Sequence, residues 1–370
     1  MSLVKILRWT EALPVFEQLT IQSHKGPYTV EFNDQFLFES DDLPGASNHF
    51  LIDANVARLY ASQLAAVLSH PNTIVIEANE ENKSIEKIVP IIERLVQNKI
   101  RRDQTLVAVG GGVIQDITCF IASTLLRGLK WKFFPTTLLA QADSCIGSKS
   151  SVNLGATKNI LGTFYPPKKI SINTAFLETL TRKEIQSGLG EIIKVHAIDG
   201  VAAFDRLASD FKRLDTDRLV LMNYVRAALL VKQRFIEEDE FDLGIRNIFN
   251  YGHSFGHAIE SATQYKVPHG IAVTLGMEIA NSVAVQRGLL PVAHYHRMHE
   301  VLQQNYAAYA KTTVPTVAML SALMKDKKNT TTMLVLVLPV GEEAKIQRVQ
   351  IAPDDAFRTQ CVQALKALRA

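Results

Sequence analysis

Three histidines in the second half of the chain have a spacing that suits a metal ion. His253 and His257 lie four residues apart in GHSFGH, and His269 begins HGIAV. Residues four apart share one face of a helix, so the first two imidazoles are expected to point the same way. Glu191, in GLGEIIK, adds a carboxylate. Two histidines and one glutamate with an open position form a recurrent catalytic zinc arrangement, which polarises a substrate hydroxyl or carbonyl.

Histidines scattered over helix surfaces are the plain alternative to this metal site. The glycines that flank the GHSFGH histidines, and Gly270 directly after His269, argue against that alternative. The spacing also differs from the HExxH pattern, so metalloprotease chemistry is not indicated.

A second group of polar residues suits an anion. Lys149 lies among small residues in PTTLLAQADSCIGSKSSVN, a stretch with few other charges. Lysine suits phosphate as a point charge, whereas arginine suits planar anions that accept two hydrogen bonds. A solvated charged surface is the usual explanation of any one such residue. The other candidates are Arg127, Asp143, Asn153, Lys158, Asn159, Lys194, Lys232, Arg246, Asn250, Lys327 and Lys328.

A glycine-rich turn, AVGGGVIQD, follows an apolar run and precedes a helical pattern. Gly110, Gly111 and Gly112 let the backbone approach a ligand closely. The amide groups at the start of the next helix favour a pyrophosphate. The turn is not the GxGxxG fingerprint, so a purely structural turn is the alternative.

The elements that must position these residues change in character along the chain. Residues 50–56, 73–79, 105–112 and 130–137 are short apolar strands, and residues 84–99 have a helical pattern. This alternation predicts a mostly parallel sheet with helices on both faces and ligands at the carboxyl ends of its strands. Long helical patterns then cover residues 182–198, 217–239, 250–265 and 270–288, and residues 332–341 form one isolated strand.

Length and composition limit the number of domains, the kinds of partner and the cellular location. A chain of 370 residues fits two domains, and we place them at residues 1–178 and 179–370. The net charge of +3 does not favour nucleic acid as a partner. Three cysteines without a CxxC pair, no membrane-length apolar run and no signal-peptide pattern predict a cytoplasmic protein.

Taken together, the segments GGGVIQDITCFIASTLLRG, KNILGTFYPP, TLTRKEIQSGLGEIIK, GIRNIFNYGHSFGHAIE and HGIAVTLGM resemble the sugar phosphate cyclases, and within them the 3-dehydroquinate synthase family. The resemblance covers residues 53–338. It implies an N-terminal α/β domain of Rossmann type that binds NAD, and an all-α C-terminal domain that carries the metal. It also implies a homodimer.

The resemblance assigns roles residue by residue. The metal, zinc or alternatively cobalt, would be bound by Glu191, His253 and His269. NAD would be bound by Asp53, Asn55, Glu80, Lys83, Gly110, Gly111, Gly112, Asp116, Thr136, Thr137, Asp143, Lys149 and Lys158. The sugar phosphate would be contacted by Lys149, Asn159, Lys194, Lys232, Arg246, Asn250, His257, one of Lys327 and Lys328, and Arg127 across the dimer interface.

The implied reaction uses NAD as a recycled catalyst. A hydroxyl is oxidised, phosphate leaves by β-elimination, hydride returns, and an intramolecular aldol step closes a carbocycle. Lys232, Arg246 and Asn250 match the pattern of enzymes whose substrate, 3-deoxy-arabino-heptulosonate 7-phosphate, carries a carboxylate. The alternatives are a cyclase of secondary metabolism (valiolone, aminodehydroquinate or deoxy-inosose type), a metal-dependent polyol dehydrogenase, and a non-catalytic sensor.

The chain departs from the family pattern at several positions. Ile271 replaces the glutamate of HGEAV, and Ser148 replaces the second glycine of GGK. Gln115 and Cys119 stand where glycines are usual, and Gly190 replaces the alanine of GLAE. Ile271 adjoins a predicted metal ligand, where it could alter the support of that ligand. These departures indicate a divergent branch of the family.

Overall fold

The chain forms two compact units. A computed structural model describes residues 17–33, 47–155, 157–326 and 329–368. Within these ranges, residues 17–191 and 232–247 form an α/β unit, and residues 192–231 and 248–370 form a helical unit. The sequence places one boundary at 178/179, which is close to the start of α5 (Arg182–Asp199). In the structure the division between the units falls inside helices, at residues 191/192 in α5 and at residues 231/232 in α7 (Arg218–Glu238).

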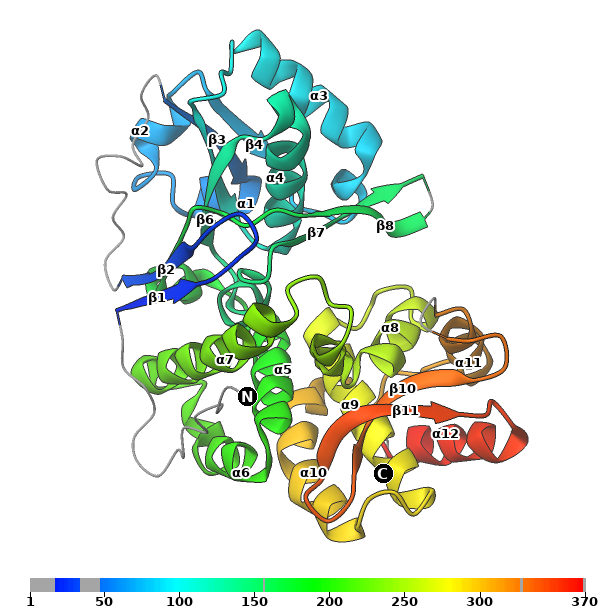
Figure 1. Cartoon of the computed structure of the whole chain (residues 1–370). Coiled ribbons are helices and arrows are strands. Elements are labelled where there is room, and N and C mark those ends of the chain that lie inside the picture. The colour runs from blue at the N-terminus through cyan, green and yellow to red at the C-terminus, as the bar shows by residue number, and fades with distance from the viewer. Residues whose placement is uncertain (1–16, 34–46, 156, 327–328, 369–370) are drawn as a thin grey trace, which may run out of the picture. The chain divides into compact units, whose positions relative to one another are not determined.

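A seven-stranded sheet is the centre of the α/β unit (Figure 1). Its strands lie in the order β1 (Gln18–Ile21), β2 (Tyr28–Asn33), β9 (Lys169–Asn173), β6 (Lys130–Pro135), β5 (Thr105–Gly110), β3 (Asn48–Asp53) and β4 (Thr73–Ile76). Neighbouring strands are parallel except β1 and β2, which are antiparallel. The predicted strands β3 to β6 are therefore confirmed, whereas β1, β2 and β9 were not predicted.

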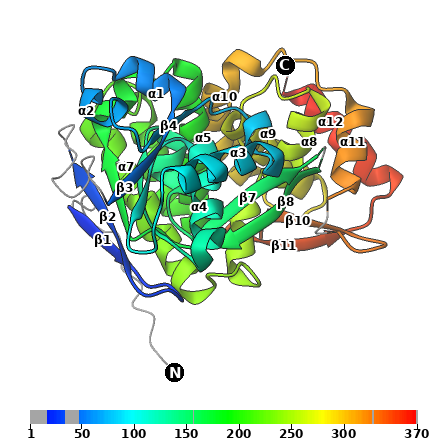
Figure 2. The ribbon, with the colours of Figure 1, turned by 90° about the horizontal axis from the view of Figure 1, so that it is seen from above.

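Helices cover both faces of this sheet (Figure 2). They are α1 (Ala54–Leu59), α2 (Ala65–Leu68), α3 (Ile85–Gln97) and α4 (Gly112–Thr124). On one face, Ile52 and Val109 join a core cluster with residues of α1 and α2. The alternate residues Leu51 and Ala108 are equally buried, and α4 packs against β3, β5 and β6. Burial on both faces explains the nearly continuous apolar sequence of the central strands.

Shorter elements complete the α/β unit. Strands β7 (Lys149–Leu154) and β8 (Thr157–Phe164) form an antiparallel hairpin. Short helical segments are η2 (Glu81–Lys83), η3 (Leu125–Arg127), η4 (Ala140–Ser144) and η5 (Thr174–Thr179). These elements carry several predicted site residues, although their polar sequences gave no clear periodic signal.

The helical unit is built around α9 (His269–Gln286), which is buried along most of its length. Its other elements include α6 (Val201–Asp210), α8 (His253–Ala262), α10 (Val292–Tyr306), α11 (Thr316–Met324) and α12 (Asp355–Ala367). The prediction of one isolated strand was wrong, because β10 (Leu334–Val340) pairs with β11 (Lys345–Ile351). The polar sequence KIQRVQI hid the second strand. None of the described helices combines the length and apolar character needed to cross a bilayer.

Candidate active site

The three histidines lie together in the helical unit. His253 and His257 are on α8, and His269 is the first residue of α9. Nitrogen atoms of the three rings all lie within 4.8 Å of one another. In tetrahedral coordination, nitrogens at about 2.0–2.1 Å from an ion lie about 3.3–3.4 Å from one another. The three imidazoles therefore form a cluster of nitrogen donors, and this donor set fits a divalent metal.

Glycines bring α8 and α9 close enough to assemble this cluster. A Cβ atom on Gly276 would lie 2.0 Å from the carbonyl oxygen of Gly252, and one on Gly256 would lie 3.1 Å from Ala272. Larger residues at these positions would push the helices apart. The glycines of GHSFGH and HGIAVTLG therefore set the spacing between the imidazoles.

Hydrogen bonds orient the imidazoles of His253 and His269. The Nδ1 atom of His253 lies 3.3 Å from the carbonyl oxygen of Tyr251, and that of His269 lies 3.3 Å from Oε2 of Glu260. Because both partners are acceptors, each Nδ1 carries the proton and each Nε2 can bind a metal. The roles of His253 and His269 as metal ligands stay predictions. Sequence reasoning missed Glu260, which the phrase GHAIE places three residues after His257.

Glu191 and Lys194 lie on α5 and are almost fully buried, at 1% and 2% exposure. Glu191 is the last residue of the first segment of the α/β unit, and Lys194 belongs to the helical unit. The ammonium of Lys194 lies 5.7 Å from the ring centre of Phe249. The role of Glu191 as the third metal ligand stays a prediction.

A cavity of about 280 Å³ lies at the carboxyl ends of β3 and β6 in the α/β unit, where such sheets bind ligands. Four residues that are predicted to bind the cofactor line it, namely Asp53, Asn55, Thr136 and Thr137. Asp53 accepts a hydrogen bond of 2.8 Å from the amide of Asn55, and burial raises the pKa of Asp53. The volume is close to the lower end of the ~300–1,000 Å³ range of small-molecule pockets, so it suits part of a dinucleotide.

The predicted glycine turn joins β5 to α4. Strand β5 ends at Gly110, Gly111 caps the helix, and α4 begins at Gly112. The backbone amides of this helix start are donors of the kind that bind a pyrophosphate. The residues of the turn therefore fit a dinucleotide.

Lys83 joins three other predicted residues into one network. Its ammonium donates to Oδ2 of Asp116 at 3.1 Å and to Oδ1 of Asn159 at 3.0 Å, and it lies 3.5 Å from Glu80. Asp116 also accepts a hydrogen bond of 3.0 Å from the amide of Ser151. Burial raises the pKa of Asp116, and the charge of Lys83 opposes that rise. The network links η2, α4 and the β7–β8 hairpin.

Three cations for which the sequence predicts a role in anion binding, Lys149, Lys232 and Arg246, belong to the α/β unit. Lys149 forms an ion pair with Asp242, and the ammonium of Lys232 lies 3.0 Å from Oδ1 of Asp143. Burial, followed by the charge of Arg246, lowers the pKa of Lys149. The charges of Arg246 and Lys232 both act on Lys149, so the three cations lie near one another, an arrangement that favours an anionic ligand.

Arg246 is held by backbone carbonyl groups. Both terminal nitrogens donate to the oxygen of Gly147 at 3.2 Å, and Nη1 also donates to the oxygen of Glu240 at 2.5 Å. Among the described residues, these bonds do not use the Nε–H or the neighbouring Nη2–H. The two groups are parallel donors, an arrangement that matches a carboxylate. Carbonyl acceptors orient the guanidinium without cancelling its charge.

The remaining predicted residues are more dispersed. Lys158 is exposed on β8, and Arg127 is exposed in η3 with a φ of 65°. Asn250 ends η7 (Ile245–Asn250) and belongs to the helical unit. Lys327 and Lys328 lie outside the described residues.

Comparison with known proteins decides the family. Residues 73–187 match the 3-dehydroquinate synthase N-terminal family, and residues 188–329 match its C-terminal counterpart. The chain belongs to the 3-dehydroquinate synthase family. The resemblance to the sugar phosphate cyclases and the two-part fold are thereby confirmed.

Individual members of the family align with most of the chain. The 3-dehydroquinate synthase of Alkaliphilus metalliredigens is 33% identical over 84% of this chain and 88% of its own length. That of Streptococcus pyogenes serotype M3 is 31% identical over 92% and 96%. Among solved structures, a 2-epi-5-epi-valiolone synthase from Streptomyces hygroscopicus with NAD+ and Zn2+ bound is 28% identical, with a TM-score of 0.81 over 92% of this chain and 96% of that one.

Proposed function

We propose that the protein is a sugar phosphate cyclase that converts 3-deoxy-arabino-heptulosonate 7-phosphate to 3-dehydroquinate and releases phosphate. The curated relatives support this activity, since those named 3-dehydroquinate synthase are 31–34% identical over most of the chain. The observation that carries the choice of substrate is the paired Nε–H and Nη2–H edge of Arg246, which suits a carboxylate.

The proposal gives each part of the site a task. When bound, NAD supplies a reversible hydride acceptor, and zinc or cobalt supplies a Lewis acid. Asp53, Thr136 and Thr137 would hold part of the cofactor in the cavity. His253 and His269 would hold the metal through Nε2. Lys149, Lys232 and Arg246 would bind the anionic groups of the substrate and oppose the charge that builds up as phosphate leaves.

Phosphate release across a small panel of sugar phosphates tests the proposal. With NAD and zinc present, we expect turnover of the heptulosonate phosphate, and little turnover of glucose 6-phosphate or of a seven-carbon sugar phosphate that lacks the carboxylate. NADH absorbance should not accumulate, because the cofactor is regenerated in each cycle. Steady NADH accumulation would instead identify a polyol dehydrogenase.

Arg246→Ala sharpens this test. Loss of hydrogen bonds to a charged group should lower kcat/KM for the heptulosonate phosphate by about 10- to 100-fold. Arg94→Ala is the matched control, because Arg94 is exposed on α3 and outside the site. Full turnover of the heptulosonate phosphate by the Arg246→Ala enzyme would contradict the proposed substrate.

A second candidate is a cyclase of secondary metabolism whose substrate lacks the carboxylate. The likeness to the valiolone synthase favours it, with a TM-score of 0.81. The same panel separates the two candidates, since this enzyme would prefer the carboxylate-free seven-carbon substrate and would tolerate the loss of Arg246.

Two finer expectations accompany the proposal. One is a cytoplasmic location, expected for an enzyme of biosynthesis with three buried free cysteines. The other is a homodimer in which Arg127 of one subunit reaches the site of its partner. Light scattering of the wild-type protein and of Arg127→Ala tests the dimer.

A further inference from the structure

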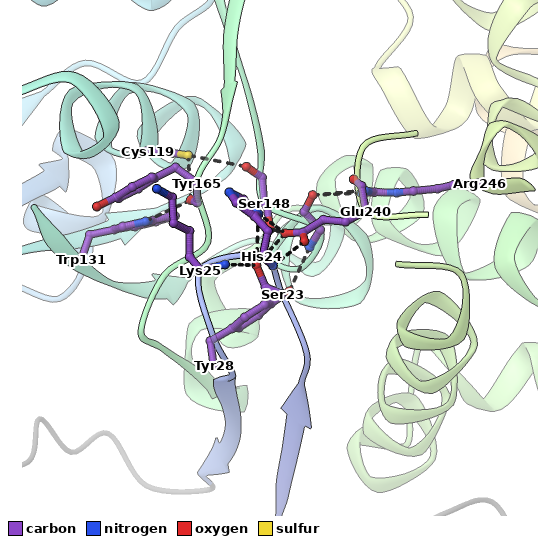
Figure 3. Close-up of polar contacts among 11 residues, drawn as sticks. Ser23, His24, Lys25, Tyr28, Cys119, Trp131, Ser148, Tyr165, Glu240 and Arg246 are labelled. Atoms are coloured by element: carbon purple, nitrogen blue, oxygen red, sulfur yellow. Dashed lines mark hydrogen bonds and ion pairs between the residues drawn. The ribbon is translucent and has the colours of Figure 1, made fainter. Parts of the chain in front are cut away.

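A single carboxylate, that of Glu240, connects three segments of the α/β unit (Figure 3). In the turn between β1 and β2, the Ser23 hydroxyl donates to Oε1 at 2.6 Å and the His24 amide donates to Oε2 at 2.8 Å. In the segment before β7, the Ser148 hydroxyl donates to Oε1 at 2.7 Å. The third segment is the loop after α7, in which the carbonyl oxygen of Glu240 accepts from Arg246 at 2.5 Å.

The surroundings keep Glu240 ionised. Its side chain is only 10% exposed, and His24 Nδ1 lies 3.0 Å from Oε1. Burial raises the pKa of Glu240, but the hydrogen bonds from Ser23, Ser148 and His24 together outweigh burial and lower it. Hydrogen bonds to an ionised acceptor are stronger than neutral ones, so the three segments are held firmly to one point.

Ser148 has a backbone conformation that disfavours a side chain. Its φ is 65°, in the left-handed region where glycine is preferred, and the family pattern has glycine at this position. The hydroxyl bond to Glu240 offsets that strain. Serine therefore contributes here a link to the β1–β2 turn that glycine cannot make.

The backbone around Ser148 is fixed on its other side as well. Its carbonyl oxygen accepts a 2.7 Å bond from the amide of Tyr165. The carbonyl oxygen of Tyr165 in turn accepts from Trp131 Nε1 and from Cys119 Sγ, both at 3.2 Å. Ser148 adjoins both Gly147, which binds Arg246, and Lys149. Movement of Ser148 would therefore move two of the cations of the anion site.

We propose that Glu240 and Ser148 are positioning residues that set the distance between Lys149 and Arg246, and that the β1–β2 turn acts as their support. The chemistry that benefits is the simultaneous binding of two anionic groups on one substrate, a phosphate and a carboxylate. The proposal rests on the proposed function for its substrate, but the geometry of the link is independent of turnover.

The variants Ser148→Gly and Ser148→Ala separate positioning from structural support. Both remove the bond to Glu240, but only glycine also relieves the strained φ. Positioning predicts that Ser148→Gly melts no lower than wild type and yet raises KM for the heptulosonate phosphate about five- to tenfold, with kcat changed less than about twofold. Lys99→Gly is the matched control, since Lys99 is exposed outside the site with a φ of 58°. The control should keep the wild-type KM.

Glu240 variants and hydrogen exchange complete the test. Glu240→Ala should raise KM more than Ser148→Gly does, and Glu240→Gln, which keeps one acceptor, should recover part of the loss. Without substrate, the amides of residues 146–151 should exchange faster in Ser148→Gly than in wild type, and those of α3 should not change. A wild-type KM with unchanged exchange in Ser148→Gly would overturn the proposal. A wild-type enzyme that is inactive on the heptulosonate phosphate would overturn the proposed function alone, because the exchange measurement still decides the link.

Discussion

The carbonyl oxygen of Gly147 lies 3.2 Å from both terminal nitrogens of Arg246. This contact requires a glycine for two reasons. The φ of Gly147 is 103°, which side chains rarely adopt, and a Cβ atom there would lie 2.0 Å from Nη2 of Arg246. The guanidinium therefore rests directly against the backbone, and its orientation depends on the absence of a side chain.

Gly147→Ala should displace Arg246 and weaken substrate binding. We expect kcat/KM for the heptulosonate phosphate to fall by about 10- to 100-fold, comparable to loss of a charged hydrogen-bond donor. Gly288→Ala is the control, because Gly288 has a φ of 67° but open space around its Cβ position. The control should lose some stability and keep its kinetics. Unchanged kcat/KM in Gly147→Ala would show that Arg246 does not bind the substrate.

Glu260→Ala should weaken metal binding without removing a predicted ligand. The carboxylate lies 3.3 Å from Nδ1 of His269 and orients that ring, and such supports contribute about 10- to 100-fold to metal affinity. Competition with a chromophoric chelator gives the zinc affinity directly. Glu300→Ala, at an exposed position on α10, should bind zinc as wild type does. Equal affinity of the Glu260 variant and wild type would remove Glu260 from the site.

Sequence analysis predicted those parts of the molecule whose structure depends on residues close together in the chain. Strands β3 to β6 carry apolar runs, and the i, i+4 spacing of His253 and His257 places both imidazoles on one helix face. The glycines of GHSFGH indicated a special site before their packing role between α8 and α9 was visible. These features depend on neighbours along the chain, so one sequence suffices to find them.

Contacts between distant segments could not be predicted in the same way. Glu240 binds Ser23, which is 217 residues away, and no local pattern links the two. Strand β11 was missed because its exposed polar residues hide the alternation. Glu260 was missed because a glutamate on a helix is usually a solvated residue, and only the fold shows its carboxylate against His269.

Lys83→Met should destabilise the α/β unit by leaving Asp116 without its ion-pair partner. The side chains of Lys83 and Asp116 are 9% and 19% exposed, so we expect a loss of about 3 kcal/mol near neutral pH, at the lower end for broken buried pairs. Burial already raises the pKa of Asp116, and removal of Lys83 raises it further. The destabilisation should therefore shrink as the pH falls and Asp116 becomes neutral.

Thermal melting at pH 7.5 and pH 5 measures this difference, with NAD omitted so that cofactor binding does not contribute. Lys87→Met is the control, since Lys87 is exposed on α3. A Lys83→Met protein that melts like wild type at both pH values would show that Asp116 has another source of compensation.

The stability of the Glu278→Gln variant relative to wild type should increase as the pH rises. Glu278 is 3% exposed on α9, and burial raises its pKa, although hydrogen bonds from Tyr295 and His299 oppose the rise. A raised pKa means that the folded state binds the proton more tightly than the unfolded state. The contribution of Glu278 to stability is therefore present in acid and lost as the pH rises through the folded pKa.

Glutamine keeps an acceptor for the 2.6 Å contact with His299 and has no charge to bury. The melting temperature of the variant minus that of wild type should accordingly increase from pH 4.5 to pH 8, whereas Glu300→Gln should show a flat difference. A difference that decreases over this range would mean that the ionised form of Glu278 is favoured by the fold.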